Sequence, residues 1–325
     1  MADLPRTLVL FPGALGDFLC LLPALAVITE KDGRNLTLVA KPELLSLPAW
    51  PRAARVSIDR SELATLYSPE DVLADTGRER RHRLPAQTLA LLGGHAVAHS
   101  WSGSGIDGFA TRFGELAESS FVHRFRGMAP GEHAAAYFAR CLGVTPASPA
   151  QVRSVLARDD RWLGELAPQL PSSSRWWVIH PGSGSPAKNW SGFLELLTRL
   201  SADRAGEQRW IGQEDRILVL LGPAEEERGT ALPADTLVRS PSLPQLAALL
   251  ERSDRYLGND SGVSHLAGAI GSRGVALFAD TAASCWAPRG DVRVLQAAAA
   301  SCDCGVFCTH RLSVDTVLRA LTERR

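Results

Sequence analysis

The chain has 325 residues, of which 45% are hydrophobic and 22% are charged, as in an ordinary globular protein. Its 35 basic and 35 acidic residues give a formal net charge of +0, which argues against a large binding surface for nucleic acid. Since a domain usually has about 100–200 residues, two domains are expected.

The apolar start of the chain does not have the form of a signal peptide. Pro12, Asp17 and Pro23 interrupt it, and no small-residue cleavage site follows. No segment reaches the roughly 18 uninterrupted apolar residues that a membrane span needs. We therefore expect a cytoplasmic protein, with a peripheral contact at the inner face of the cytoplasmic membrane left open.

Short apolar runs alternate with helical segments along the chain, and this pattern occurs twice. In the first half, strands are predicted at residues 7–11, 36–40, 55–58, 97–99 and 121–125, with helices at 18–28 and 131–142. Residues 143–175 contain several prolines and a serine run, which is typical of a connection between domains.

In the second half, strands are predicted at residues 176–180, 217–221, 237–239, 275–278 and 292–295, with another ending at Leu257. Helices are predicted from 193, over 246–251 and over 312–321. Two runs of alternating strand and helix indicate two α/β domains with parallel sheets, which we place at residues 1–156 and 157–325. Ligands of such sheets bind beyond the carboxyl ends of the strands, and two facing domains imply a cleft between them.

The loop after the strand at 176–180 has the composition of a phosphate-binding turn. It runs His180-Pro181-Gly182-Ser183-Gly184-Ser185, and Lys188 follows with a positive charge. It is neither a Walker A loop nor a dinucleotide fingerprint. A plain turn with a lysine in solvent is the open alternative.

Two further strand ends carry polar groups. Asp260-Ser261-Gly262 begins a helix that contains His265, and a helix N-terminus favours anions. Glu225 follows Gly222-Pro223, where an acidic residue could accept hydrogen bonds from ribose hydroxyls. The alternatives are that Asp260 only caps the helix, that His265 is a core residue and that Glu225 is solvated.

Asp17 is an acidic residue in an apolar stretch, directly after Gly16. A partly buried carboxylate beside a cleft is a candidate general base. A role as a helix N-cap explains the same residue equally well, and both interpretations stay open.

Two clusters carry less information. Cys302, Cys304 and Cys308 precede His310 with a spacing that is not standard for zinc, so we favour a surface loop and expect no metal site. A basic run contains Arg78, Arg80, Arg81 and Arg83. It could meet an anionic acceptor, although we favour a solvated charge run.

Four motifs resemble glycosyltransferase family 9, the ADP-heptose:lipopolysaccharide heptosyltransferases. They are Leu15-Gly16-Asp17 with Leu22-Pro23-Ala24-Leu25, Ile179-His180-Pro181-Gly182-Ser183 with Lys188-Asn189-Trp190, Gly222-Pro223-Ala224-Glu225, and Asp260-Ser261-Gly262-Val263-Ser264-His265-Leu266-Ala267-Gly268-Ala269 with Val275-Ala276-Leu277-Phe278 and Trp286-Ala287-Pro288. The resemblance implies a GT-B fold, in which two Rossmann-like domains face a cleft and the C-terminal helix returns toward the first domain.

By the same resemblance, the chain is a metal-independent, inverting glycosyltransferase without a cofactor. Its co-substrate is a nucleotide-diphospho-sugar, expected to be ADP-heptose, and its acceptor is a cell-envelope glycan or glycolipid such as the lipopolysaccharide core. Asp17 is implied as the base and Lys188 as the residue that neutralises the leaving diphosphate. The implied donor-binding residues are His180, Gly182, Ser183, Glu225, Asp260, Ser261, Gly262 and His265. The acceptor-binding candidates are Gly16, Arg78 and Arg81.

A second hypothesis is a non-catalytic relative that binds a nucleotide or sugar as a scaffold or sensor. The Phe11-Pro12 approach to the first turn, where the family usually has a basic residue, favours it. Asp17 together with the second-domain residues argues for the enzyme.

Overall fold

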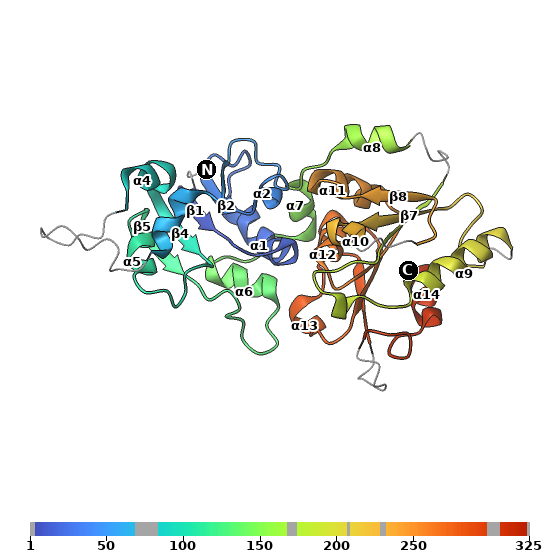
Figure 1. The fold of residues 1–325 in the computed structure, drawn as a ribbon. Coiled ribbons are helices and arrows are strands. Elements are labelled where there is room, and N and C mark those ends of the chain that lie inside the picture. Colours follow the sequence, from blue (N-terminus) through green and yellow to red (C-terminus); the bar gives the residue numbers. More distant parts are fainter. Residues whose placement is uncertain are drawn as a thin grey trace, which may run out of the picture. The chain divides into compact units, whose positions relative to one another are not determined.

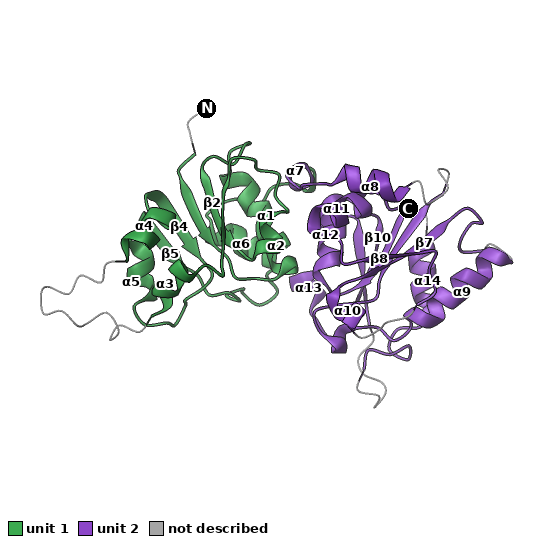
Figure 2. Ribbon diagram, turned by 45° about the horizontal axis from the view of Figure 1, so that its top comes forward, with its two compact units in different colours: residues 1–151 green, residues 152–325 purple. Residues whose placement is uncertain are grey.

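The protein is described here by a computed structural model that covers residues 4–68, 84–167, 174–206, 209–227, 232–297 and 306–323. The chain forms two compact units, Met1–Gln151 and Val152–Arg325 (Figure 2). The sequence had predicted the boundary after residue 156. Within the described ranges, no helix combines the length and apolar character that crossing a membrane would require.

The first unit is an α/β unit with a parallel sheet of five strands (Figure 1). Its strands are β1 (Thr7–Leu10), β2 (Leu36–Ala40), β3 (Ala54–Ser57), β4 (His95–Ser100) and β5 (Ala117–Val122). Its helices are α1 (Leu15–Ile28), α2 (Pro42–Leu45), α3 (Ala64–Tyr67), α4 (Ala86–Leu92), α5 (Phe109–Gly114), α6 (Ala134–Cys141) and α7 (Pro149–Ser154), the last of which crosses the boundary. The strand order is β3-β2-β1-β4-β5, so the order reverses between β1 and β4.

The second unit has a parallel sheet of six strands in the order β11-β10-β9-β6-β7-β8. These strands are β6 (Trp176–His180), β7 (Arg216–Leu221), β8 (Thr236–Arg239), β9 (Arg255–Asn259), β10 (Gly274–Phe278) and β11 (Val292–Gln296). The helices are α8 (Asp160–Leu166), α9 (Phe193–Ala205), α10 (Pro223–Glu227), α11 (Leu243–Arg252), α12 (Gly262–Ile270), α13 (Ala283–Trp286) and α14 (Val314–Thr322). The order reverses between β6 and β9, which is the point where doubly wound sheets bind ligands.

Burial on both faces explains why apolar runs in the sequence predicted the strands. Every residue of β1 and β6 is buried, because helices cover both faces of each sheet and leave no polar face. In the second unit, α11 and α12 lie on one side of the sheet and α9 and α14 on the other (Figure 1). The predicted α/β class with parallel sheets is therefore confirmed.

The C-terminal helix α14 packs within its own unit. Its buried residues Val314, Val317, Leu318 and Leu321 belong to the core that also contains the apolar face of α9. Its strong apolar stripe is buried against the second sheet, which satisfies the hydrophobic face locally. The expectation that this helix returns toward the first domain stays a prediction.

Candidate functional site

Three loops of the second unit converge on the carboxylate of Asp260. The Lys188 ammonium nitrogen lies 2.6 Å from Asp260 Oδ2, and the Thr281 hydroxyl donates to the same oxygen at 2.6 Å. Lys188 follows β6, Asp260 follows β9 and Thr281 follows β10, and these are neighbouring strands. The cluster therefore lies at the carboxyl edge of the sheet, beside the strand-order reversal.

Asp260 does not cap α12, contrary to one of the predicted alternatives. The N-cap is Ser261, whose side chain accepts a hydrogen bond from the backbone N–H of Ser264. Asp260 lies one residue earlier and is only 8% exposed. Its carboxylate is thus available to orient Lys188, whose side chain is 41% exposed.

Asn259 joins the strand end to the glycine-containing loop, a role that the sequence analysis missed. Its amide nitrogen donates to the Pro181 carbonyl at 2.7 Å, and its amide oxygen accepts from the Trp190 backbone N–H at 3.1 Å. Asn259 has no solvent exposure. It consequently holds the loop between Pro181 and Trp190 at two points. A buried strand that ends in an amide residue is the only signal of this role in the sequence.

His180, the last residue of β6, is a buried neutral imidazole at the carboxyl edge of the second sheet. It is 5% exposed, and burial lowers its pKa from 6.5 to about 4. The Ser261 hydroxyl lies 3.5 Å from His180 Nδ1. His180 therefore contributes an uncharged polar surface next to the start of α12.

Gly182 is required by the close approach of Glu225. A Cβ atom at position 182 would lie 2.3–2.6 Å from three carboxyl atoms of Glu225. Glu225 is 6% exposed, and its Oε2 accepts from the Gly222 backbone N–H at 3.1 Å. The alternative of a solvated glutamate is therefore wrong, because the β7 turn folds this carboxylate back against the loop after β6.

The remaining donor-site candidates lie in the same region. The Ser183 hydroxyl is 2.6 Å from the Ser185 carbonyl and 2.7 Å from Asn189 Oδ1, so it organises the loop. Gly262 is the first residue of α12, and His265 is 7% exposed on that helix. The buried position of His265 is the one that its core alternative predicts.

In the first unit, Asp17 lies in the first turn of α1. Its Oδ2 accepts a hydrogen bond from the Ala14 backbone N–H at 3.2 Å, while Ala14 is the N-cap and Gly16 precedes Asp17 in the helix. Asp17 thus caps the helix from its third position rather than as the N-cap residue. This local role leaves the carboxylate partly exposed, as a base would need to be.

The turn before α1 packs against a cluster of aromatic rings. A Cβ atom at Gly13 would lie 2.5 Å from the Phe11 ring, and that ring packs against Trp101 with centroids 5.9 Å apart. Phe11 follows β1 and Trp101 follows β4, so they meet where the strand order of the first sheet reverses. An apolar ring, not a basic side chain, therefore follows β1 at the Asp17 turn.

A stack of rings continues from Trp101 across the ends of β4 and β5, and the sequence analysis did not find it. His99 Nδ1 lies 3.1 Å from His123 Nε2, and the His123 ring stacks on Trp101 at 4.9 Å. Burial and the neighbouring His123 lower the pKa of His99 to about 4, and burial also lowers the pKa of His123. His99 pairs with Phe121 in the sheet register, so alternate residues of two adjacent strands supply the stack.

Several candidates fall outside the described ranges. Arg78, Arg81, Cys302 and Cys304 are among them, whereas Cys308 Sγ lies 3.9 Å from His310 Nδ1. Among the residues with described positions, no group of three or more His, Cys, Asp or Glu side chains is arranged to hold a metal ion.

This arrangement can hold a negatively charged group at the carboxyl edge of the second sheet. It combines one lysine ammonium, the N-terminus of α12 and a loop whose backbone approaches closely at Gly182. Unpaired N–H groups and the helix dipole favour an anion at such a position. The buried carboxylate of Glu225 next to this cradle suits a ligand that also has hydroxyl groups.

Comparisons with known proteins point in the same direction. Residues 148–303 match the model of glycosyltransferase family 9 (heptosyltransferase). A search of curated proteins found no match.

Three solved structures share the fold along most of their length. A family 9 glycosyl transferase of Veillonella parvula has a TM-score of 0.62 at 16% identity, covering 90% of this chain and 86% of its own. Heptosyltransferase WaaC of E. coli, solved with ADP, has a TM-score of 0.59 at 17% identity, covering 96% and 97%. The ADP-heptose LPS heptosyltransferase II of E. coli has a TM-score of 0.60 at 14% identity, covering 97% of each chain. The predicted GT-B fold class is thereby confirmed.

Proposed function

We propose that this chain, of which residues 148–303 match the model of glycosyltransferase family 9, transfers a heptose or a related sugar from a nucleotide-diphospho-sugar to a cell-envelope glycan. ADP-heptose is the proposed donor, and the lipopolysaccharide core is the proposed type of acceptor. The observation that carries the proposal is the Lys188–Asp260 pair at the strand-order reversal of the second sheet. WaaC, which shares the fold, was solved with ADP.

In this proposal the second unit binds the donor. The Lys188 ammonium, the N-terminus of α12 and the loop at Gly182 face the diphosphate, and Glu225 accepts hydrogen bonds from the ribose hydroxyls. Asp260 orients Lys188 through Oδ2 and offers its other oxygen to a hydroxyl of the transferred sugar. His180 and Ser261 line the same wall, and neutral His180 adds no charge that would have to be balanced.

The reaction is a single displacement with inversion at the anomeric carbon. Asp17 accepts the proton of the acceptor hydroxyl, the acceptor oxygen forms a bond to the anomeric carbon, and the bond to the diphosphate oxygen breaks. The two electrons of that bond leave with the nucleoside diphosphate, whose new negative charge is stabilised by Lys188 and by α12. These positive groups take the role that a metal ion has in other transferases, so we propose that none is needed.

The acceptor is proposed to bind the first unit, near Asp17. A glycolipid acceptor would bring the enzyme to the inner face of the cytoplasmic membrane. The rings of Phe11 and Trp101 next to the Asp17 turn are buried, so these two positions supply no positive charge for a phosphate of the acceptor.

A donor panel tests this proposal. The protein is incubated with ADP-heptose and, in parallel, with UDP- and GDP-sugars, while its unfolding temperature and the release of nucleoside diphosphate are measured with and without EDTA. A ligand at 100 times its dissociation constant stabilises by about 2.7 kcal/mol, so the preferred donor should be distinct. Stabilisation by ADP-heptose with release of ADP, unchanged by EDTA, is expected. Binding without any release, with every acceptor offered, would favour the non-catalytic relative instead.

A further inference from the structure

Residues 307–312, which precede the C-terminal helix α14, contact both loops whose side chains bind Asp260. Lys188 reaches Asp260 Oδ2 from the loop after β6, and Thr281 reaches the same oxygen from the turn after β10. In the sheet, β9 lies between these two strands, and Asp260 follows β9. A segment that holds the loops on both sides of β9 therefore fixes the groups that bind Asp260.

The loop after β6 is held close to Lys188. The Trp190 indole N–H donates to the Leu312 carbonyl at 2.9 Å, and the Ser191 backbone N–H donates to the Phe307 carbonyl at 2.9 Å. The side chains of Trp190, Phe307 and Leu312 are buried in one core. Because Lys188 is only two residues before Trp190, the backbone that carries its ammonium group is held in place.

The turn after β10 is held by Arg311. Its Nη2 lies 2.6 Å from Asp280 Oδ1 and its Nη1 lies 3.3 Å from Asp280 Oδ2, so two guanidinium nitrogens bind two carboxylate oxygens. The Arg311 side chain is 8% exposed, whereas that of Asp280 is 81% exposed. The arginine is thus fixed in the protein and holds a carboxylate at the surface. Since Thr281 is the next residue, this pair also restricts the position of the Thr281 hydroxyl.

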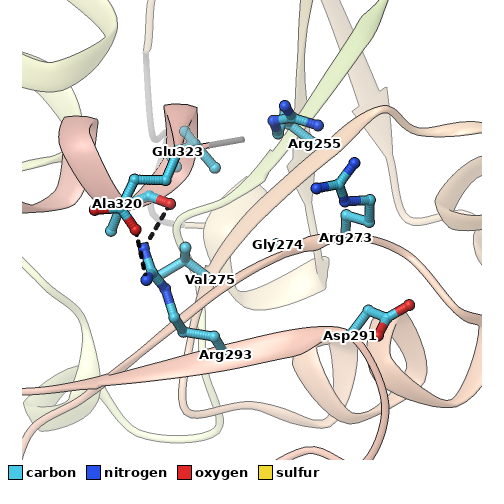
Figure 3. Close-up of a pocket in the computed structure, with 9 residues that line it drawn as sticks. Arg255, Arg273, Gly274, Val275, Asp291, Arg293, Ala320 and Glu323 are labelled. Atoms are coloured by element: carbon cyan, nitrogen blue, oxygen red, sulfur yellow. Dashed lines mark hydrogen bonds and ion pairs between the residues drawn. The ribbon is translucent and has the colours of Figure 1, made fainter. Parts of the chain in front are cut away.

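The helix that follows residues 307–312 is itself anchored at two places. The apolar face of α14 is buried in the core of the second unit. Figure 3 shows the end of α14, where Arg293 Nη1 lies 2.7 Å from Glu323 Oε2 and Arg293 Nη2 donates to the Ala320 carbonyl at 2.8 Å. Arg311 lies just before this helix, so its backbone starts from a fixed support.

We propose that Arg311 is a positioning residue of the donor site. Through Asp280 it keeps the Thr281 hydroxyl on Asp260 Oδ2, the oxygen that also binds the Lys188 ammonium. Without this hydroxyl, the Asp260 carboxylate would be free to turn and to take the lysine with it. The inference rests on the proposed function, because the charge that is positioned is the one that meets the donor diphosphate.

The first test measures ADP affinity by calorimetry. Arg311→Met removes the guanidinium and keeps an apolar stem, and Thr281→Val removes the hydroxyl. We expect each change to weaken ADP binding by about fivefold to tenfold. The double variant should be no weaker than the weaker single variant, because the two residues act through the same contact. Arg311→Lys should recover part of the affinity, since it keeps a charge for Asp280 without the forked geometry.

Arg204→Met is the matched control. Arg204 makes the same kind of forked pair with Asp235, with Nη1 2.5 Å from Oδ2 and Nη2 2.9 Å from Oδ1. This pair lies where β8 begins, at the edge of the sheet opposite the donor loops. Arg204→Met should therefore lower the unfolding temperature and leave ADP affinity unchanged. An equal loss of ADP affinity in this control would assign the effect to general stability and overturn the proposal.

A second test needs no ligand and separates this inference from the proposed function. Hydrogen exchange of the backbone amides is measured in the ligand-free protein over residues 185–191 and 279–282. We expect Arg311→Met to speed exchange in both stretches by at least about threefold, while Arg204→Met leaves them unchanged. If the wild type binds no ADP, the proposed donor is wrong, and the exchange result still decides the role of Arg311.

Asp280→Asn guards against a folding defect in Arg311→Met. It alters an exposed side chain, so it removes the ion pair without opening a cavity, and its exchange should rise in the same two stretches. The unfolding temperature of each variant shows whether it is folded. Wild-type exchange in both stretches in the folded variants would overturn the proposal. So would an Arg311→Met variant that binds ADP as tightly as an ADP-binding wild type.

Discussion

The Lys188 ammonium nitrogen lies 2.6 Å from Asp260 Oδ2, although the two residues are 72 positions apart in the sequence. Asp260 is buried, whereas Lys188 is partly exposed. The lysine thus keeps a side that a ligand can reach, while the carboxylate fixes the position of its charge. A strongly hydrated ammonium on a flexible stem would otherwise lose more entropy on binding an anion.

Lys188→Ala should weaken the binding of ADP by about tenfold to a hundredfold. The change removes the positive charge that would bind the diphosphate. It also leaves the negative charge of Asp260 without its lysine partner, so that this carboxylate repels the diphosphate. The double variant Lys188→Ala with Asp260→Asn should recover part of the affinity, since Asn keeps an acceptor for Thr281. Calorimetry with ADP measures both effects. Equal affinities of the single and the double variant would show that the two charges do not act on the same ligand.

Gly182→Ala should destabilise the protein by about 1–3 kcal/mol, because the new methyl group overlaps the Glu225 carboxylate. Gly184→Ala is the matched control in the same loop, since a Cβ atom there meets no atom within 4 Å. Denaturant unfolding of both variants gives the difference. A cost as large for Gly184 as for Gly182 would mean that backbone entropy, rather than the contact with Glu225, determines the effect.

Asp17→Asn should abolish sugar transfer while leaving donor binding intact. An amide cannot accept the acceptor proton, and general-base catalysis is typically worth about 10²–10⁴ in rate. The Asn oxygen can still accept from the Ala14 backbone N–H, so the start of α1 should remain folded. Transfer rate and ADP affinity are measured on the same preparation. Transfer at the wild-type rate would restrict Asp17 to helix capping.

Acid should destabilise the protein through His180. Burial lowers its pKa from 6.5 to about 4, so the unfolded chain binds the proton first. The stabilisation is complete above pH 6.5 and is lost as the pH falls toward 4, by about 3 kcal/mol in total. As the pH falls across this range, the wild type should therefore lose unfolding free energy relative to His180→Asn. His99, whose pKa is also lowered, is present in both proteins and does not contribute to the difference. A difference that is independent of pH would contradict the buried neutral state.

The strands and the edge of the sheet that carries the donor loops could be predicted from the sequence. The run 176–180 corresponds to β6 residue for residue, because a strand covered on both faces is apolar along nearly its whole length, here up to the terminal His180. The polar residues after these runs then had to lie at one edge of a parallel sheet. Glu225, Lys188 and Asp260 were found for this reason.

The partners of these residues could not be predicted. Asn259 and the stack of His99 on His123 depend on the order and register of the strands, which bring together residues from distant parts of the chain. The sequence left Asp260 open between a helix cap and a ligand-binding residue, because an aspartate at the start of a helix can serve in either role. In the structure the N-cap of α12 is Ser261, one residue after Asp260.

The sequence by itself determined the α/β alternation, the two sheets and the family motifs, since burial periodicity and turn chemistry are local properties. Only the tertiary structure decided that Lys188 pairs with Asp260, that Glu225 packs on Gly182, and that Arg311 pairs with Asp280. These are contacts between different strands and loops, and their geometry is set by strand order and packing rather than by spacing along the chain.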